Sequence, residues 1–225
     1  MWFTLLHMRV VSKADYRRLC QEHLADLRTF LHELPDHRWD EPSLCDGWKV
    51  RDVVGHLTIG RTIPVPTVLW RVAKGGFKVD AVVDRESRAY AAARTPDEIR
   101  ADFDRETSRP KERGLSGIEP PAAKLGDNVT HLFDITIPLG LDAGVPEERL
   151  AATLGALSSV GMWGSKQRAR GVRLVADEVG EPIGDGPEVR GPAGSIIVAL
   201  SGRHRGLDDL TGDGVPLLRE RLAAS

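Results

Sequence analysis

Hydrophobic residues in the first two thirds of the chain recur at steps of three and four, the period of an amphipathic helix. The clearest stripe lies between Ser12 and Pro35, and it contains Tyr16, Leu19, Cys20, His23, Leu24, Leu27, Phe30, Leu31 and Leu34. Ser12 is typical of a helix N-cap, and a proline is typical of the position just after a helix. Further helices are expected at residues 48–63, 68–77, 80–93, 96–106, 124–139 and 146–163.

Two of these expected helices carry start signals. Thr95-Pro96-Asp97-Glu98 combines a threonine N-cap, a proline at the first helical position and a glutamate three residues after the cap. Asp46 is placed to cap the helix at 48–63. Between the helices at 96–106 and 124–139, the prolines and glycines of residues 107–123 predict a long loop.

The pattern changes after Gly164. Residues 171–177 alternate like a strand, residues 180–186 are rich in glycine, and residues 192–200 and 217–224 suit two short helices. Short strands joined to short helices predict a small α+β unit. We therefore expect a mainly α protein with two domains, a helical bundle at residues 1–165 and a small α+β domain at residues 166–225.

The composition is typical of a soluble protein that acts on small molecules. Hydrophobic residues make up 41% of the chain and charged residues 28%, and the formal net charge is -2, so no electrostatic footprint for nucleic acid is present. Cys20 and Cys45 are too few for a disulfide framework, and two reduced thiols in a cytoplasmic protein are expected. Residues 1–11 are apolar but too short for a membrane span, and they lack the basic start of a signal peptide. Met8 is an alternative natural start of the chain.

Polar residues at apolar positions of two helices suggest a metal site. His56 lies among valines, leucines and isoleucines of the helix at 48–63, whereas Asp127 and His131 stand four apart on the helix at 124–139. Side chains four apart leave the same helix face, so this pair and His56 can converge on one divalent ion. From spacing alone, a buried structural histidine and a solvated Asp–His pair remain open alternatives. Asp134 is placed to orient the ring of His131 from the next turn.

A resemblance to a known family adds to this pattern. The block Trp39-x-x-Pro42-Ser-Leu-Cys-Asp-Gly-Trp48, followed by Arg51-Asp52-Val-Val-Gly-His56-Leu57, resembles the N-terminal signature of the mycothiol-dependent maleylpyruvate isomerase family. That family is one of the DinB-like metal-binding helical bundles. The block from Asp127 to Gly140 and the tail from Gly186 to Arg203 also resemble it. The resemblance covers nearly the whole chain, and it implies a DinB-like up-down four-helix bundle with a small C-terminal domain.

The resemblance also implies a ligand set. It assigns His56, Asp127 and His131 to a divalent metal, with zinc expected and nickel as the alternative. The isomerase has the longer glutamate at the acidic position, so the shorter Asp127 is expected to ligate the metal either directly or through a water molecule. Arg203 matches the C-terminal arginine that the resemblance places toward the metal, where a guanidinium could bind an anionic substrate. Arg190 is the second candidate for that role.

Three functions follow as hypotheses. The first is a metal-dependent transferase or isomerase that uses mycothiol, a low-molecular-weight thiol, against a small anionic electrophile. The second is metal-dependent hydrolysis, for which Asp52 and Asp134 are the only candidate bases, although Asp52 equally suits a first-turn helix acid. The third is a non-catalytic binding or regulatory module. A monomer or homodimer in an actinobacterium is expected, with no nucleic-acid or membrane partner.

Overall fold

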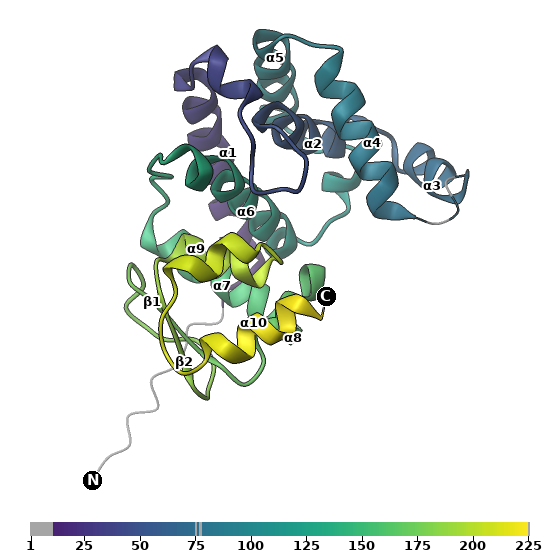
Figure 1. Ribbon diagram of the computed structural model, residues 1–225. Coiled ribbons are helices and arrows are strands. Elements are labelled where there is room, and N and C mark those ends of the chain that lie inside the picture. Colours follow the sequence, from purple (N-terminus) through teal and green to yellow (C-terminus); the bar gives the residue numbers. More distant parts are fainter. Residues whose placement is uncertain (1–10, 75, 77, 225) are drawn as a thin grey trace.

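The computed structural model describes residues 11–74, 76 and 78–224, and most of them are helical (Figure 1). Two strands and several 3₁₀ turns complete the fold. The α-helices are α1 (Lys13–Glu33), α2 (Val50–Thr62), α3 (Val65–Lys74), α4 (Val79–Ala92), α5 (Pro96–Thr107), α6 (Pro121–Leu139), α7 (Glu147–Val160), α8 (Ser165–Ala169), α9 (Ala193–Leu200) and α10 (Val215–Ala223). No helix among the described residues is long and apolar enough to cross a membrane.

Local capping explains where the main helices begin. The Ser12 hydroxyl accepts from the backbone N–H of Asp15, whose carboxylate accepts from the backbone N–H of Ser12, and Thr95 and Glu98 form the same reciprocal pair. Both starts agree with the prediction from sequence. The expected cap of α2 was wrong: Lys49 is its N-cap, and the carboxylate of Asp52, not Asp46, accepts from the Lys49 backbone N–H at 2.9 Å.

Helices α1, α2, α5 and α6 form a four-helix bundle (Figure 1). The guanidinium of Arg100, near the start of α5, donates to the carbonyls of Leu31 and Leu34 at the end of α1, so these helices run antiparallel. Helices α2 and α6 are also antiparallel, because Arg61 near the end of α2 bonds Asn128 in the first half of α6. Helices α3 and α4 extend to one side of the bundle, where α4 packs on α2.

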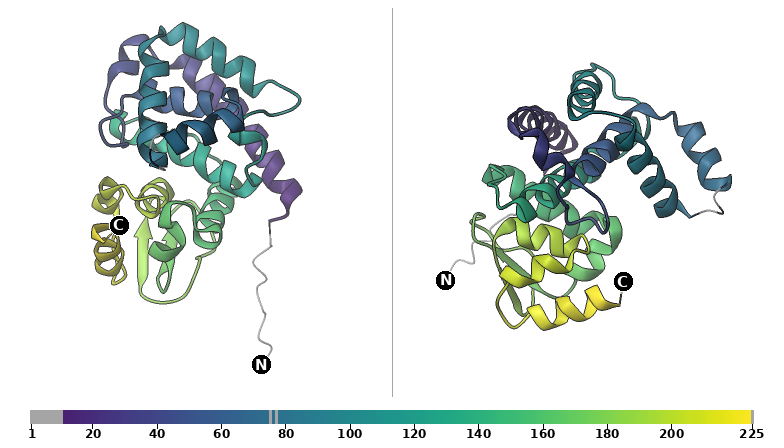
Figure 2. Two further views of the ribbon diagram at one scale, coloured as in Figure 1. Left: turned by 90° about the vertical axis from the view of Figure 1, so that its right-hand side faces the viewer. Right: turned by 45° about the horizontal axis from the view of Figure 1, so that its top comes forward.

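The C-terminal part joins the bundle through α9, which packs against α6 and α7 (Figure 2). Strands β1 (Arg173–Ala176) and β2 (Glu188–Gly191) pair in parallel, and the 3₁₀ helix η4 (His204–Asp209) packs on α9. A mainly α fold with a small α+β part is therefore confirmed. The boundary between residues 165 and 166 stays a prediction.

Several elements differ from those expected. Helix α6 begins at Pro121, because proline suits the first helical position, and the predicted loop is shorter. Helix α7 ends at Val160, where Gly161 adopts a left-handed conformation, and the separate short helix α8 follows. Strand β2 lies in a segment that was not predicted to be a strand.

A close backbone contact holds η4 against α9. A Cβ atom at Gly206 would lie 2.5 Å from the Ser195 carbonyl oxygen and 2.8 Å from the Ala199 nitrogen, both of them backbone atoms. Replacement by alanine must therefore separate the two elements. We expect Gly206→Ala to lower the free energy of unfolding by about 1–3 kcal/mol.

Chemical denaturation tests this expectation, with Gly155→Ala as the matched control. Gly155 lies inside α7, and a Cβ added there meets no atom within 4 Å, so alanine should stabilise the helix by about 0.5–1 kcal/mol. Equal effects of the two substitutions would contradict this account of the α9–η4 contact.

Candidate metal centre

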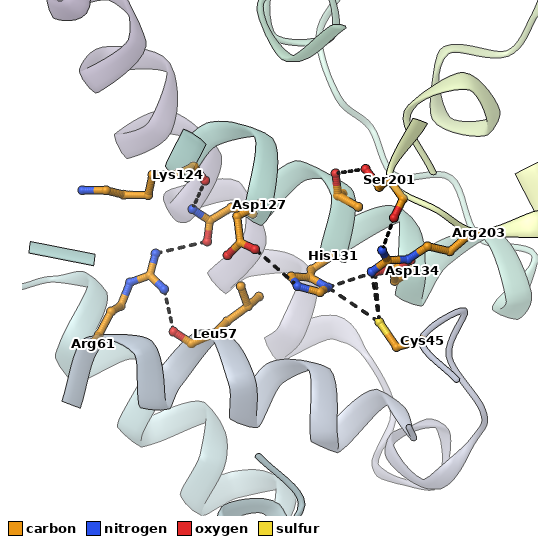
Figure 3. Close-up of polar contacts among 11 residues, drawn as sticks. Cys45, Leu57, Arg61, Lys124, Asp127, His131, Asp134, Ser201 and Arg203 are labelled. Carbon is orange, nitrogen blue, oxygen red and sulfur yellow. Dashed lines mark hydrogen bonds and ion pairs between the residues drawn. The ribbon is translucent and has the colours of Figure 1, made fainter. Parts of the chain in front are cut away.

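The three predicted donors lie together between α2 and α6. His56 comes from α2, and Asp127 and His131 come from successive turns of α6; one donor atom from each lies within 4.8 Å of the others. Asp127 Oδ1 is 3.4 Å from His131 Nε2, and Figure 3 shows these two side chains pointing toward each other. The arrangement thus joins a pair set by helix periodicity to a third residue supplied by a neighbouring helix.

The spacing suits a divalent cation. Two ligand atoms bonded at about 2.0–2.1 Å to a tetrahedral metal lie roughly 3.4 Å apart, which is the separation of Asp127 from His131. His56 Nδ1 is buried and has no hydrogen-bond partner among the described residues, and its ring lies 4.9 Å from that of His131, centroid to centroid. A neutral imidazole with an unpaired nitrogen, a second imidazole and a carboxylate form a donor set for zinc or a similar divalent metal. The residues present therefore fit a metal.

A buried carboxylate orients His131 from behind. Asp134, which is fully buried, accepts a hydrogen bond from His131 Nδ1 at 2.9 Å, so Nε2 is the ring nitrogen that faces Asp127. Arg203 donates to both oxygens of Asp134, from Nε at 3.0 Å and from a terminal nitrogen at 2.7 Å. The Cys45 thiol donates to the same carboxylate at 3.1 Å (Figure 3). A carboxylate that fixes the tautomer and ring of a histidine in this way supports metal ligation.

The ionisable side chains of the site shift one another's pKa values. Burial acts to lower the pKa of His131, but the Asp127 and Asp134 carboxylates outweigh it and raise that pKa well above its ordinary value. Burial acts to raise the pKa of Asp127, yet the two histidines lower it to about 2. Burial, with the charge of His131, lowers the pKa of His56 to about 4. In the absence of metal, a protonated His131 thus lies between two carboxylates beside a neutral His56.

A second group of possible donor atoms comes from Cys45, His131 and Asp134, but a positively charged side chain already contacts this group. The guanidinium of Arg203 donates to Asp134 and, at 3.4 Å, to the Cys45 sulfur. A metal there would face that positive charge at close range, so the group with His56 and Asp127 is the better cation site.

The two predicted catalytic residues have structural partners. Asp52 lies at the start of α2 and caps its first turn through the Lys49 backbone. Arg203 lies on the far side of His131 from Asp127, and its nitrogens donate to Asp134, Cys45 and the Ser201 carbonyl oxygen. Arg190 is exposed and bonds Glu188. The structure therefore brings Arg203 to the site through Asp134, and it gives Arg190 and Asp52 other contacts.

Arg61 is a neighbour of the site that the sequence did not single out. Its buried guanidinium donates to the Leu57 carbonyl oxygen at 2.5 Å and to Asn128 at 3.1 Å, and burial lowers its pKa. The positive charge of Arg61 also lowers the pKa of Asp127. The available signal was a charged residue one turn after Leu57, on the same face of α2.

The carboxyl group of Glu119, just before α6, has its pKa shifted toward neutral pH. Burial, reinforced by the negative charge of Asp127, raises its pKa from an ordinary 4.5 to about 7. Because the folded protein holds this proton more tightly than the unfolded chain, the stabilisation is present below pH 4.5 and is lost as the pH rises to about 7. Metal-free Glu119→Gln is expected to exceed the wild type in unfolding free energy by about 2–3 kcal/mol at pH 8, and to match it near pH 4.5.

Urea denaturation of the metal-free protein at both pH values measures this difference. Glu181→Gln is the control, because Glu181 is exposed. A Glu119→Gln variant no more stable than this control at pH 8 would argue against a buried charge at residue 119.

Comparisons with known proteins bear on the N-terminal part of the sequence and on the fold. Residues 20–114 match the family model described as the mycothiol maleylpyruvate isomerase N-terminal domain. Two solved structures are similar, the mycothiol-dependent maleylpyruvate isomerase and a histidine-to-alanine mutant of it. Each has a TM-score of 0.55 and 18% sequence identity, over 90% of this chain and 93% of the other. No curated protein matches the chain significantly.

The family match covers most of α1 and all of α2 to α5, so it includes His56 but not Asp127 or His131. The structural match covers 90% of the chain and so extends the shared fold beyond residue 114. At 18% identity the structural match is a statement about the fold. What the family match shows is a similarity of residues 20–114 to the mycothiol maleylpyruvate isomerase N-terminal domain.

Proposed function

We propose that this protein is a metal-dependent enzyme that uses a low-molecular-weight thiol, mycothiol in the first instance, to isomerise a small anionic electrophile or to transfer the thiol to it. The observation that carries the proposal is the cluster of His56, Asp127 and His131 in a chain with a mycothiol maleylpyruvate isomerase N-terminal domain. Zinc is the proposed metal, because two imidazoles and one carboxylate leave a position open on a four-coordinate ion.

A bound divalent cation would supply the positive charge that lowers the pKa of a thiol, and the thiolate is the nucleophile in such reactions. Addition of the thiolate to an activated double bond, rotation about the resulting single bond and expulsion of the same thiolate would give the isomer. Displacement of a leaving group would give a thioether. The thiol and the substrate are both small molecules, and we place the reaction in the cytoplasm.

The protein's own residues would orient the reactants and exclude water. Asp134 keeps the Nε2 atom of His131 directed at the donor cluster, and Arg203 holds Asp134 in its ionised form. Binding of a substrate carboxylate by Arg203 stays a prediction, and its present contacts support a positioning role as well. The thiol of Cys45 donates a hydrogen bond to Asp134, which supports a structural role for Cys45.

The test is a turnover assay of zinc-loaded, untagged protein with maleylpyruvate, with and without mycothiol. Isomerisation that requires both zinc and the thiol is expected, and mass spectrometry of reactions with an electrophile bearing a leaving group would reveal thioether formation. Hydrolysis that proceeds without thiol would replace the proposal by a metal-dependent hydrolase. No turnover of any of these substrates by fully loaded protein would leave a binding module.

A further inference from the structure

A large cavity lies away from the metal donors. It has a volume of about 1140 Å³ and is bounded by the N-terminal half of α1, the segment between α5 and α6, and the start of α6. His56, Asp127 and His131 do not line it. Small-molecule sites have volumes of about 300–1000 Å³, so this cavity is large enough to hold a ligand and ordered water.

The lining of the cavity is unusually basic for a protein of net charge -2. Six lysine and arginine residues line it against two acidic residues, Glu112 and Glu119. Lys124 forms an ion pair with Glu112, and Arg109 binds both carboxylate oxygens of Glu106, so these two cations are neutralised. The remaining four cations are Lys13, Arg17, Arg28 and Lys111.

None of these four contacts a carboxylate within the described part of the chain. Lys13 and Arg17 stand one turn apart on α1, Arg28 follows three turns later on the same face, and Lys111 belongs to the facing segment. Arg28 donates to the hydroxyls of Thr107 at 3.4 Å and Ser108 at 2.9 Å, which draws the two walls together. Positive charge thus faces the cavity from both walls.

Like charges that line one cavity repel one another, and an anion bound between them would lower that repulsion. A concave wall also focuses the potential, because low-dielectric protein excludes part of the screening water. Guanidinium and ammonium groups bind phosphate and carboxylate oxygens through charge-assisted hydrogen bonds, and the hydroxyl of Ser108 adds a neutral donor. An uncharged or cationic ligand would leave the four cations uncompensated.

We propose that this cavity is a binding site for a small polyanion, a molecule with several phosphate or carboxylate groups, and that this site is separate from the metal centre. The inference does not depend on the reaction proposed above. It concerns a different wall of α1 and α6, and its test uses metal-free protein.

Isothermal titration calorimetry at low ionic strength tests the site, with pyrophosphate in one arm and citrate in the other. One molecule of at least one probe is expected to bind per chain, and the affinity should fall as salt is added. The arm with the higher affinity distinguishes a phosphate site from a carboxylate site. Binding should persist in His56→Ala, which separates this cavity from the metal donors.

The decisive variant is Arg17→Glu combined with Lys111→Glu, which reverses one charge on each wall. Its affinity is expected to fall by at least about 10-fold, whereas Arg219→Glu, an exposed site outside the cavity, should bind like the wild type. Lys111→Gln alone, in an exposed position, is the second variant should the double reversal fail to fold, with a smaller loss expected. No binding of either probe by the wild type, or equal affinity in the charge variants and the Arg219→Glu control, would overturn the proposal.

Discussion

The His56→Ala variant is expected to purify without stoichiometric metal while it keeps its fold. The wild type should carry about one zinc or similar ion per chain, and removal of one of three protein ligands should lower the metal affinity by more than about 100-fold, since changes in supporting residues alone cost 10–100-fold. The fold should survive because His56 Nδ1 makes no hydrogen bond whose loss would leave a buried partner unpaired. Elemental analysis of untagged protein and circular dichroism measure the two effects.

The control for this prediction is His204→Ala, because His204 is exposed and lies outside the donor cluster. This variant should retain the metal content of the wild type. Thiol-dependent turnover, if present, should disappear from His56→Ala together with the metal. Wild-type metal content in His56→Ala, or absence of metal from both proteins after incubation with zinc, would contradict the assignment of the site.

The second large effect is expected from Asp134→Asn. This substitution removes the buried negative charge that Arg203 and a protonated His131 share, and it leaves Asp127 as the carboxylate beside His131. Breaking a buried ion pair by neutralising one partner typically costs about 3–5 kcal/mol, because the other charge is left uncompensated. We expect a loss of this size in unfolding free energy for the metal-free protein, and a 10–100-fold weaker affinity for zinc because His131 loses its orienting partner.

Urea denaturation and a competitive zinc titration measure these losses. Glu22→Gln is the control, because Glu22 pairs with Arg18 at the surface and such a pair contributes less than about 1 kcal/mol. Addition of Arg203→Met to Asp134→Asn should restore part of the lost stability, since it removes the uncompensated cation. A loss in Asp134→Asn no larger than in Glu22→Gln would mean that the carboxylate is not the centre of a buried charge network.

The helices were largely determined by the sequence. The reciprocal caps of Ser12 with Asp15 and of Thr95 with Glu98 involve residues three apart, so they need no distant partner. The four-residue spacing of Asp127 and His131 likewise sets their common face as soon as α6 forms. These features depend on local backbone geometry, which a sequence pattern reports directly.

The pairing of the strands and the contacts between distant side chains depended on tertiary packing. Strand β2 exists because its backbone pairs in parallel with β1, and a parallel partner cannot be identified from four residues alone. The network of Cys45, Asp134 and Arg203 joins residues up to 158 positions apart, and Arg203 reaches Asp134 because η4 and α9 bring the end of the chain to α6. The sequence thus determined which side chains share a helix face. Only the folded chain decided which faces meet, because that outcome depends on the burial of side chains from several elements at once.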